Sequence, residues 1–349
     1  MPEPTAVICR TKNRPVFLRR ALRSIAAQTT NDYHVYVIND GGDANRTAHV
    51  VAESPLPPER VTICDHADSH GRAQALIDGI HATDSPYIAV HDDDDTWDPG
   101  FLATTMAYLD SHEDAQAAFV PTDIVYEHVE GDRIVEDSRQ RVWPEITQIS
   151  LSRLAEENQA VPISGLYRRA SLEAVGGFNP NLPVVEDWEL HLRLSLAGPL
   201  GWIDTPSPLA HWHQRPAADG DEGNSTLAMS ASHAHYDQYV RDENLRTWVN
   251  TPDANNLGLL VYLGARFGEE RRRSEGLASR LDALENRVDQ LNQAFEQAND
   301  SFTRMEDSVT RVEEPLTRID ESLNLVRALD RRADRLRALR ARLRTNRRH

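Results

Sequence analysis

This chain of 349 residues is interpreted outward from one stretch, Tyr87-Ile88-Ala89-Val90-His91-Asp92-Asp93-Asp94-Asp95-Thr96-Trp97-Asp98-Pro99. Its apolar start, Ile88 to Val90, predicts a buried strand, and four consecutive carboxylates follow it. Four adjacent like charges repel one another, and no fold requires them. Because Mg²⁺ and Mn²⁺ prefer carboxylate oxygens, a divalent cation at the end of the strand would explain the cluster. The alternative is an acidic, solvated turn or a cap for the next helix.

Strand-like apolar runs alternate with stretches of helical spacing in the first third of the chain. Strands are expected at 5–10, 35–38, 61–64 and 88–90, and helices at 16–28, 71–82 and 100–111. This alternation predicts an α/β fold with a mostly parallel sheet covered on both faces. In such sheets, ligands bind beyond the carboxyl ends of the strands. All of these ends are polar here, which predicts a nucleotide-sized site lined by Thr11, Arg14, Asp40, Asp65, Asp68 and Asp92 to Asp95.

The later sequence gives weaker signals. Further strands are expected at 117–120, at 124–129 and around Trp202, whereas the polar region 130–160 is hard to place. A helix beginning at Glu186-Asp187-Trp188 is expected to end before Gly198-Pro199, because glycine and proline stop helices.

The composition indicates a globular protein, with 40% hydrophobic and 27% charged residues. Its two cysteines, Cys9 and Cys64, lie inside strand-like runs and are expected to be buried thiols, as in a reducing cytoplasm. The N-terminus lacks the pattern of a signal peptide. The longest apolar stretch, 257–267, is too short for a membrane span, which needs about 20 residues. A cytoplasmic location is therefore expected.

Six motifs follow one another along the chain: the first strand with Thr11 to Pro15, Ile38 to Gly41, Gly71-Arg72, Asp92 to Pro99, Gly176-Gly177-Phe178 and Glu186-Asp187-Trp188. Residues 5 to about 240 resemble family 2 glycosyltransferases of the GT-A fold. Each motif is weak by itself, but their order and spacing over two thirds of the chain are specific. The resemblance implies a GT-A domain over residues 1–250, with a Rossmann-like, mixed, mostly parallel sheet.

The resemblance also implies a reaction, in which a sugar passes with inversion from a nucleoside diphosphate donor to a hydroxyl of a glycan or lipid-linked glycan. Mn²⁺ or Mg²⁺ would stabilise the leaving diphosphate, with Asp94 and His213 as ligands by position. Asp187 matches the position of the base that deprotonates the acceptor, and the helix dipole is expected to keep it ionised. A UDP-sugar is the default donor, and the residues expected to hold it are Thr11, Arg14, Asp40, Arg72 and Asp92. Such enzymes act in cell-surface polysaccharide or glycoconjugate synthesis.

Simpler interpretations remain open at three residues. Asp187 would serve equally as a helix cap, Asp40 as a turn residue, and His213 as a packed residue beside Trp212. Two other functions also remain. A nucleotidyltransferase would want a glycine- and lysine-rich phosphate loop, but Thr11 to Pro15 contains no glycine. A non-catalytic oligomeric scaffold with a transferase-like domain is disfavoured by the intact set of acidic residues.

The C-terminal part has a different pattern. After an expected linker at 251–273, apolar residues follow a 4-3 spacing for seven heptads, which predicts a coiled coil over 274–330 and self-association. An amphipathic helix folded onto the first domain is the alternative. Pro315 is expected to kink or interrupt the helix. The spacing is set by Leu277, Leu281, Leu284, Val288, Leu291, Phe295, Ala298, Phe302, Met305, Val309, Val312, Leu316, Ile319, Leu323 and Val326.

The net charge of −17 disfavours a nucleic-acid partner, but it is unevenly distributed. Residues 331–349 contain nine arginines against the single Asp334, a net charge of +8. Leucines recur among these arginines, which predicts a basic amphipathic tail suited to an anionic membrane surface. A solvated tail, or one that binds an acidic protein surface, is the alternative. If the tail binds the membrane, the enzyme would act at the inner face of the cell membrane.

Overall fold

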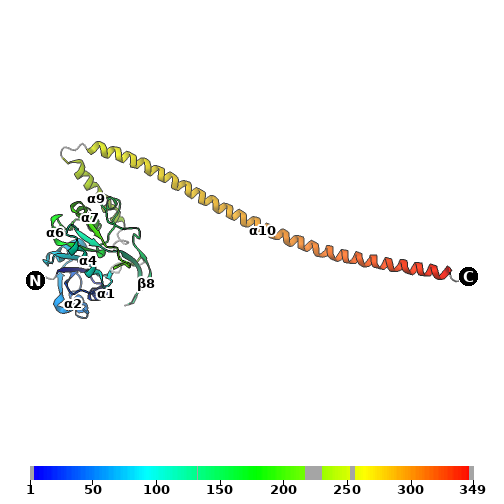
Figure 1. Cartoon of the computed structure of the whole chain (residues 1–349), viewed down its shortest axis with the longest axis horizontal. Helices are drawn as coiled ribbons and strands as arrows, with labels where there is room; N and C mark the ends of the chain where they lie inside the picture. The colour runs from blue at the N-terminus through cyan, green and yellow to red at the C-terminus, as the bar shows by residue number, and fades with distance from the viewer. Residues whose placement is uncertain (1–3, 132, 217–229, 252–255, 346–349) are drawn as a thin grey trace. The chain divides into compact units, whose positions relative to one another are not determined.

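The computed structural model describes residues 4–131, 133–216, 230–251 and 256–345. It divides the chain into two compact units, Met1–Trp248 and Val249–His349. Figure 1 shows the first unit as an α/β domain and the second as a long helix, α10.

A seven-stranded mixed sheet forms the centre of the first unit, in the order β10-β6-β9-β4-β1-β2-β3. Strand β1 is parallel to both β2 and β4, whereas β9 is antiparallel to β4 and β6. The mostly parallel sheet expected from the sequence is confirmed. Its strands are β1 (Thr5–Thr11), β2 (Tyr33–Asp40), β3 (Val61–His66), β4 (Tyr87–Asp92), β6 (Ala117–Phe119), β9 (Gly165–Arg168) and β10 (Leu200–Trp202).

Helices cover both faces of this sheet because alternate residues of each buried strand point to opposite sides. Val7 and Cys9 of β1 belong to one apolar core, and Ala6 and Ile8 belong to the other. The first core includes residues of α1 (Pro15–Ala26), α2 (Ala44–Ala52) and α4 (Phe101–Ser111). The second includes residues of α3 (Arg72–His81) and α7 (Glu186–Ala197).

Helix α3 packs closely against the sheet through a glycine. A Cβ atom on Gly79 would lie 2.5 Å from the Cγ2 of Ile8 and 3.0 Å from the Cγ1 of Ile38. The absence of a side chain therefore fixes how near α3 approaches β1 and β2. This approach places the N-terminus of α3, at Arg72, beside the carboxyl ends of these strands.

A second sheet was not expected from the sequence. It has the order β5-β11-β7-β8, formed by β5 (Thr96–Trp97), β11 (Ala210–Gln214), β7 (Thr122–Glu130) and β8 (Arg133–Arg141). Strand β5 lies directly after the four aspartates and pairs with β11. The second sheet therefore brings residues from beyond position 210 next to the acidic stretch.

The helical C-terminal part differs from the expectation at its start. Helix α10 (Asn256–Thr345) begins within the expected linker at 251–273, and it continues through Pro315 without ending. Proline removes one backbone hydrogen bond, at a cost of about 3 kcal/mol, but an exposed helix can hydrate the carbonyl that loses its partner. Helix α9 (Ser230–Val249) precedes α10. In the parts of the chain that the structure describes, no helix has the length and apolarity needed to cross a membrane.

We predict that the first unit loses stability when its core is truncated at Leu22, a fully buried residue of α1. Leu22→Ala should lower the free energy of unfolding by about 2–5 kcal/mol, because it leaves a cavity. The control Leu196→Ala, at a residue of α7 that is 70% exposed, should change it by less than about 0.5 kcal/mol. All six tryptophans precede residue 249, so tryptophan fluorescence during urea unfolding reports on this unit alone. Equal midpoints for the two variants would contradict the assigned core.

Candidate active site

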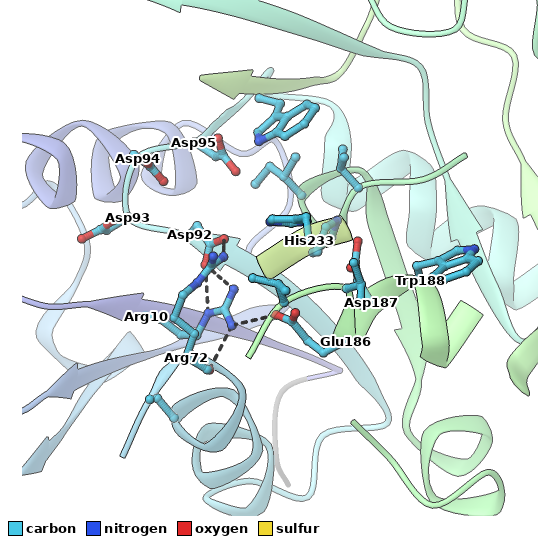
Figure 2. A pocket seen from close by; sticks show the side chains of 18 of the residues that line it. Arg10, Arg72, Asp92, Asp93, Asp94, Asp95, Glu186, Asp187, Trp188 and His233 are labelled. Carbon is cyan, nitrogen blue, oxygen red and sulfur yellow. Dashed lines mark hydrogen bonds and ion pairs between the residues drawn. The ribbon is translucent and has the colours of Figure 1, made fainter. Parts of the chain in front are cut away.

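A cavity of about 740 Å³ lies at the carboxyl ends of β1, β2 and β4. Seven of the eight site residues expected from the sequence line it, and Figure 2 shows how the acidic residues and Arg10 and Arg72 lie around it. These seven are Thr11, Arg14, Asp40, Arg72, Asp92, Asp94 and Asp187. His213 does not line the cavity.

Asp92, at the end of β4, is held by two guanidinium groups. The Nε of Arg10 donates to its Oδ1 at 2.9 Å, and Nη2 of Arg72 lies 3.2 Å from its Oδ2. Burial alone would raise the pKa of this carboxyl group, but the charges of Arg10 and Arg72 outweigh burial and lower it. Asp92 is therefore an ionised group with oxygens directed toward two cations.

Asp94 is ionised for the same reason, with different partners. Nη2 of Arg14 donates to its Oδ2 at 2.5 Å, and Arg215, which follows β11, donates to the same oxygen. Burial opposes ionisation, but these two cations hold the pKa of Asp94 well below its usual range. A carboxylate that needs two arginines for compensation is a strong anionic centre at the wall of the cavity.

Asp93 and Asp95 are chemically different from their neighbours, although the sequence does not distinguish them. Burial, opposed by the charge of Arg14 and supported by that of Asp94, raises the pKa of Asp93 to about 6. Its Oδ2 accepts a hydrogen bond of 2.7 Å from Thr11. Asp95 accepts one of 2.9 Å from the backbone N–H of His213, which joins the acidic loop to β11. These two side chains shape the loop.

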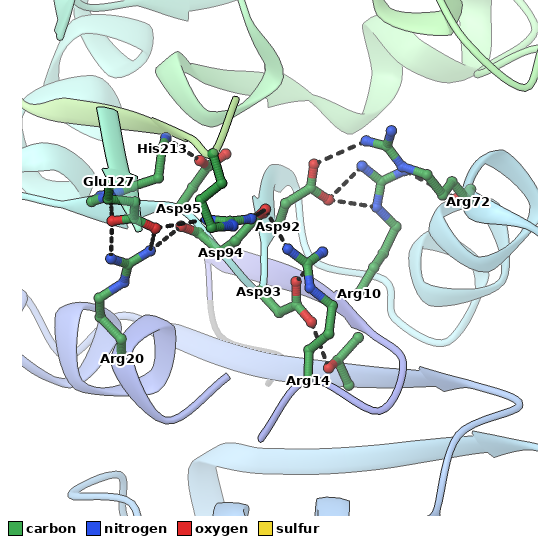
Figure 3. Close-up of polar contacts among 12 residues, drawn as sticks. Arg10, Arg14, Arg20, Arg72, Asp92, Asp93, Asp94, Asp95, Glu127 and His213 are labelled. Atoms are coloured by element: carbon green, nitrogen blue, oxygen red, sulfur yellow. Dashed lines mark hydrogen bonds and ion pairs between the residues drawn. The ribbon is translucent and has the colours of Figure 1, made fainter. Parts of the chain in front are cut away.

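His213 was expected to ligate a metal, and in the structure it lies in a hydrogen-bond network beside the acidic loop. Its Nδ1 lies 2.7 Å from Glu127 Oε2 and its Nε2 lies 2.9 Å from Thr96 Oγ1, so both ring nitrogens have partners within the protein. The same Glu127, on β7, also accepts a hydrogen bond from Arg20 (Figure 3). It accepts another from Arg215. His213 therefore belongs to a buried network that holds Arg215 against Asp94.

Asp40 fixes a neighbouring loop at the end of β2. Its carboxylate accepts hydrogen bonds from Ser69 Oγ at 2.6 Å and from the backbone N–H groups of His70 at 2.6 Å and Gly71 at 3.1 Å. Burial is the largest influence on its pKa, but these donors together outweigh it and lower the pKa. Gly41 adopts a positive φ of 73°, and a Cβ there would lie 2.5 Å from the backbone N of Ser69. The two loops therefore pack directly on each other.

Asp187 is the second residue of α7, and the N-cap position is occupied by Val185. Asn158 donates a hydrogen bond of 2.8 Å to its Oδ2. The sequence suggested that the helix N-terminus would keep Asp187 ionised. Backbone N–H groups and Asn158 do act in that direction, but burial outweighs them and raises the pKa of Asp187 above its usual value. A carboxylate with a raised pKa is a stronger proton acceptor.

Several residues of the cavity region escaped the sequence interpretation. Arg10 precedes Thr11 at the end of β1, so its position at a strand end was the available signal. Its guanidinium also lies 3.7 Å from Glu186. His233 of α9 lines the cavity too. Glu127 and Arg215 had no comparable signal, because they are placed by the unexpected second sheet.

The donor atoms present fit a hard divalent cation. Asp92 and Asp94 both line the cavity and offer carboxylate oxygens, which Mg²⁺ and Mn²⁺ prefer over nitrogen or sulfur ligands. The arginines beside Asp92 and Asp94 show that these buried carboxylates need nearby positive charge, which a divalent cation would also supply.

Comparisons with known proteins agree with this geometry. Residues 6–176 match the family model described as "Glycosyl transferase family 2". A PGL/p-HBAD biosynthesis glycosyltransferase of Mycobacterium bovis is 28% identical over 191 residues, which are 54% of this chain and 68% of that protein. The succinoglycan biosynthesis protein ExoW of Rhizobium meliloti is 34% identical over 104 residues, which are 29% of this chain and 32% of that protein.

A solved structure shares the fold. The crystal structure of S. aureus TarS 1-349 in complex with UDP-GlcNAc superimposes with a TM-score of 0.51 at 16% identity. The match covers 63% of this chain and 61% of that one, so the chain spans less than two thirds of that structure.

The buried network around Glu127 gives a prediction about stability. Glu127→Gln should lower the free energy of unfolding by about 3–5 kcal/mol, because it removes the charge that Arg20 and Arg215 share in the interior. Glu136, its cross-strand partner on β8, is 47% exposed and pairs with Arg139, so Glu136→Gln should cost less than about 1 kcal/mol. Urea unfolding followed by tryptophan fluorescence measures both. A loss for Glu127→Gln no greater than for its partner would contradict the network.

Proposed function

We propose that this chain, which contains a glycosyltransferase family 2 domain matched over residues 6–176, transfers a sugar from a nucleoside diphosphate sugar to a hydroxyl group with inversion. The observation that carries this proposal is one cavity lined by an arginine-paired carboxylate, Asp94, and a carboxylate of raised pKa, Asp187. Departure of the nucleoside diphosphate needs positive charge, and attack by the hydroxyl needs a base. The two carboxylates suit these two separate tasks.

Asp94 would hold Mn²⁺ or Mg²⁺, with Asp92 beside it. When bound, the metal supplies positive charge that stabilises the leaving diphosphate. Arg14 lines the same cavity and offers a guanidinium suited to phosphate oxygens. Thr11, Asp40 and Arg72 lie at the ends of β1 and β2 and the start of α3, where they would bind the base and ribose of the donor.

Asp187 would accept the proton of the attacking hydroxyl. Because its pKa is raised, Asp187 binds a proton more tightly than an ordinary aspartate, as a base that works near neutral pH must. The hydrogen bond from Asn158 orients the carboxylate. The acceptor would be a glycan or a lipid-linked glycan; the curated relatives are named for PGL/p-HBAD biosynthesis and for succinoglycan biosynthesis. The fold is shared with TarS, which is described with UDP-GlcNAc, so a UDP-sugar is the donor to test first.

Substitution of the two carboxylates separates the two tasks. Asp187→Asn should lower transfer about 10²–10⁴-fold through loss of the base, while the nucleoside diphosphate still binds. Asp94→Asn should abolish activation by Mn²⁺ or Mg²⁺. The matched control is Asp98→Asn, whose residue is 47% exposed in the same loop and lies outside the cavity lining. Release of nucleoside diphosphate from a panel of nucleotide sugars measures all three. Undiminished turnover by Asp187→Asn would overturn the assignment of the base.

We also propose that α10 associates with copies of itself as a coiled coil. Within this unit, thirteen apolar side chains of the heptad positions are 48–76% exposed, although each would gain by leaving water. Their two-position stripe is the pattern that partner helices bury. A second copy of the chain supplies such a stripe. The thirteen exposed apolar residues are Leu277, Leu281, Leu284, Val288, Leu291, Phe295, Phe302, Met305, Val309, Leu316, Ile319, Leu323 and Val326.

Charges placed in the stripe should dissociate the oligomer. The double variant Leu281→Glu/Leu284→Glu should shift the mass toward the monomer, because glutamates at facing core positions would be buried without partners. Gln290→Glu, on the same helix but outside the stripe, should leave the mass unchanged. Light scattering after size-exclusion chromatography measures the mass. A monomeric wild-type chain, or an unchanged mass for the double variant, would refute self-association.

The basic end of the chain is proposed to contact an anionic membrane at its cytoplasmic face. The arginines of its described part, Arg331, Arg332, Arg335, Arg337 and Arg340, are exposed on α10. Each arginine near an anionic surface contributes about 1 kcal/mol of attraction.

Removal of residues 331–349 should therefore abolish sedimentation with vesicles that contain anionic lipid. Neutral vesicles serve as the control, and added salt should weaken the binding because it screens the charges. Sedimentation that persists unchanged after the deletion would exclude this contact.

A further inference from the structure

A second cluster of potential ligands lies outside the cavity, between β3 and α3. It consists of His66 at the end of β3, His70 in the following loop and Asp78 in the second turn of α3. Nε2 of His66 lies 3.3 Å from Asp78 Oδ2, and Nδ1 of His70 lies 3.0 Å from the same oxygen. Two imidazole nitrogens, from β3 and from the following loop, thus lie beside one carboxylate oxygen of α3.

The spacing of these atoms fits a tetrahedral metal ion. Ligands about 2.0–2.1 Å from zinc at tetrahedral angles lie about 3.3 Å from one another. The three candidate ligand atoms all lie within 4.8 Å of one another. The rings of His66 and His70 are stacked, with centroids 4.1 Å apart, so binding requires one ring to rotate until the ion lies in the plane of both rings. Such a site has three protein ligands and one position for water or another ligand.

The groups behind the ligands are those expected of a metal site. Asp40 Oδ1 lies 3.2 Å from Nδ1 of His66, and Gln74 donates a hydrogen bond of 2.8 Å to Asp78 Oδ1. A carboxylate on the far nitrogen of a histidine fixes the ring and directs the lone pair of the other nitrogen at the metal. His66 lies between two carboxylates, and a neutral imidazole carries one N–H for the two contacts. A cation between Nε2 and Asp78 makes both contacts favourable.

We propose that His66, His70 and Asp78 bind a transition-metal ion of the zinc type. Two imidazoles with one carboxylate favour Zn²⁺, whereas Mg²⁺ and Mn²⁺ favour the all-oxygen donors of the cavity. The site is accessible, because the side chain of His70 is 47% exposed. The ion ties the loop between β3 and α3 to the helix. The same loop donates three hydrogen bonds to Asp40, so the metal also fixes a wall of the cavity.

Zinc binding by the full chain tests this proposal independently of the transferase reaction. The chelator-treated protein is titrated with Zn²⁺ against a colorimetric chelator in excess Mg²⁺, which occupies all-oxygen sites. One tight zinc per chain is expected for the wild type. His70→Ala and Asp78→Asn should weaken binding by at least about 100-fold, because loss of an outer partner alone costs 10–100-fold.

The matched control is His81→Ala, at an exposed histidine at the end of the same helix, which should bind zinc like the wild type. Tryptophan fluorescence confirms that each variant is folded. Absence of a tight zinc from the wild type, or equal affinity in His70→Ala, Asp78→Asn and the wild type, would overturn the proposal.

Discussion

Charge compensation around four consecutive aspartates is the constraint on which the rest of this structure depends. Asp93, Asp94 and Asp95 are only 2%, 7% and 4% exposed. An ionised carboxylate costs several kcal/mol to bury unless a cation accompanies it. The cations come from β1, from the loop after β1, from α3 and from the end of β11, so the packing of every one of these elements serves the acidic loop.

The charge compensation also explains why two of the four aspartates in this loop remain ionised although they are buried. Asp92 and Asp94 remain ionised through their arginines, whereas burial raises the pKa of Asp93 and Asp95. The same arginines keep positive charge at the place where a diphosphate would bind. Glu127 extends this balance one step further, because it holds Arg215 against Asp94 from the second sheet.

The sequence predicted the parts of the fold that depend on local pattern. The apolar runs of β1 to β4 and the polar residues at their ends indicated an edge of the sheet where Asp92 and Asp94 lie, and the family resemblance added Asp187; all three line one cavity. It did not reveal β8, whose side chains are mostly exposed and lack a clear alternation. Arg215 and Glu127 lie 88 positions apart, and no local pattern indicates such a pair. The partners of His213 could not be predicted for the same reason, because one of them, Glu127, lies on β7, far away in the sequence.

The central claim is that Asp94 is held by arginines until a divalent cation takes their place. The most direct measurement is a crystal structure of the full chain with Mn²⁺ and a nucleoside diphosphate, in which anomalous scattering locates the metal. The account predicts a manganese ion on the carboxylate of Asp94, with Arg14 turned toward the phosphates. Manganese located away from Asp94, with both arginines still on that carboxylate, would contradict it.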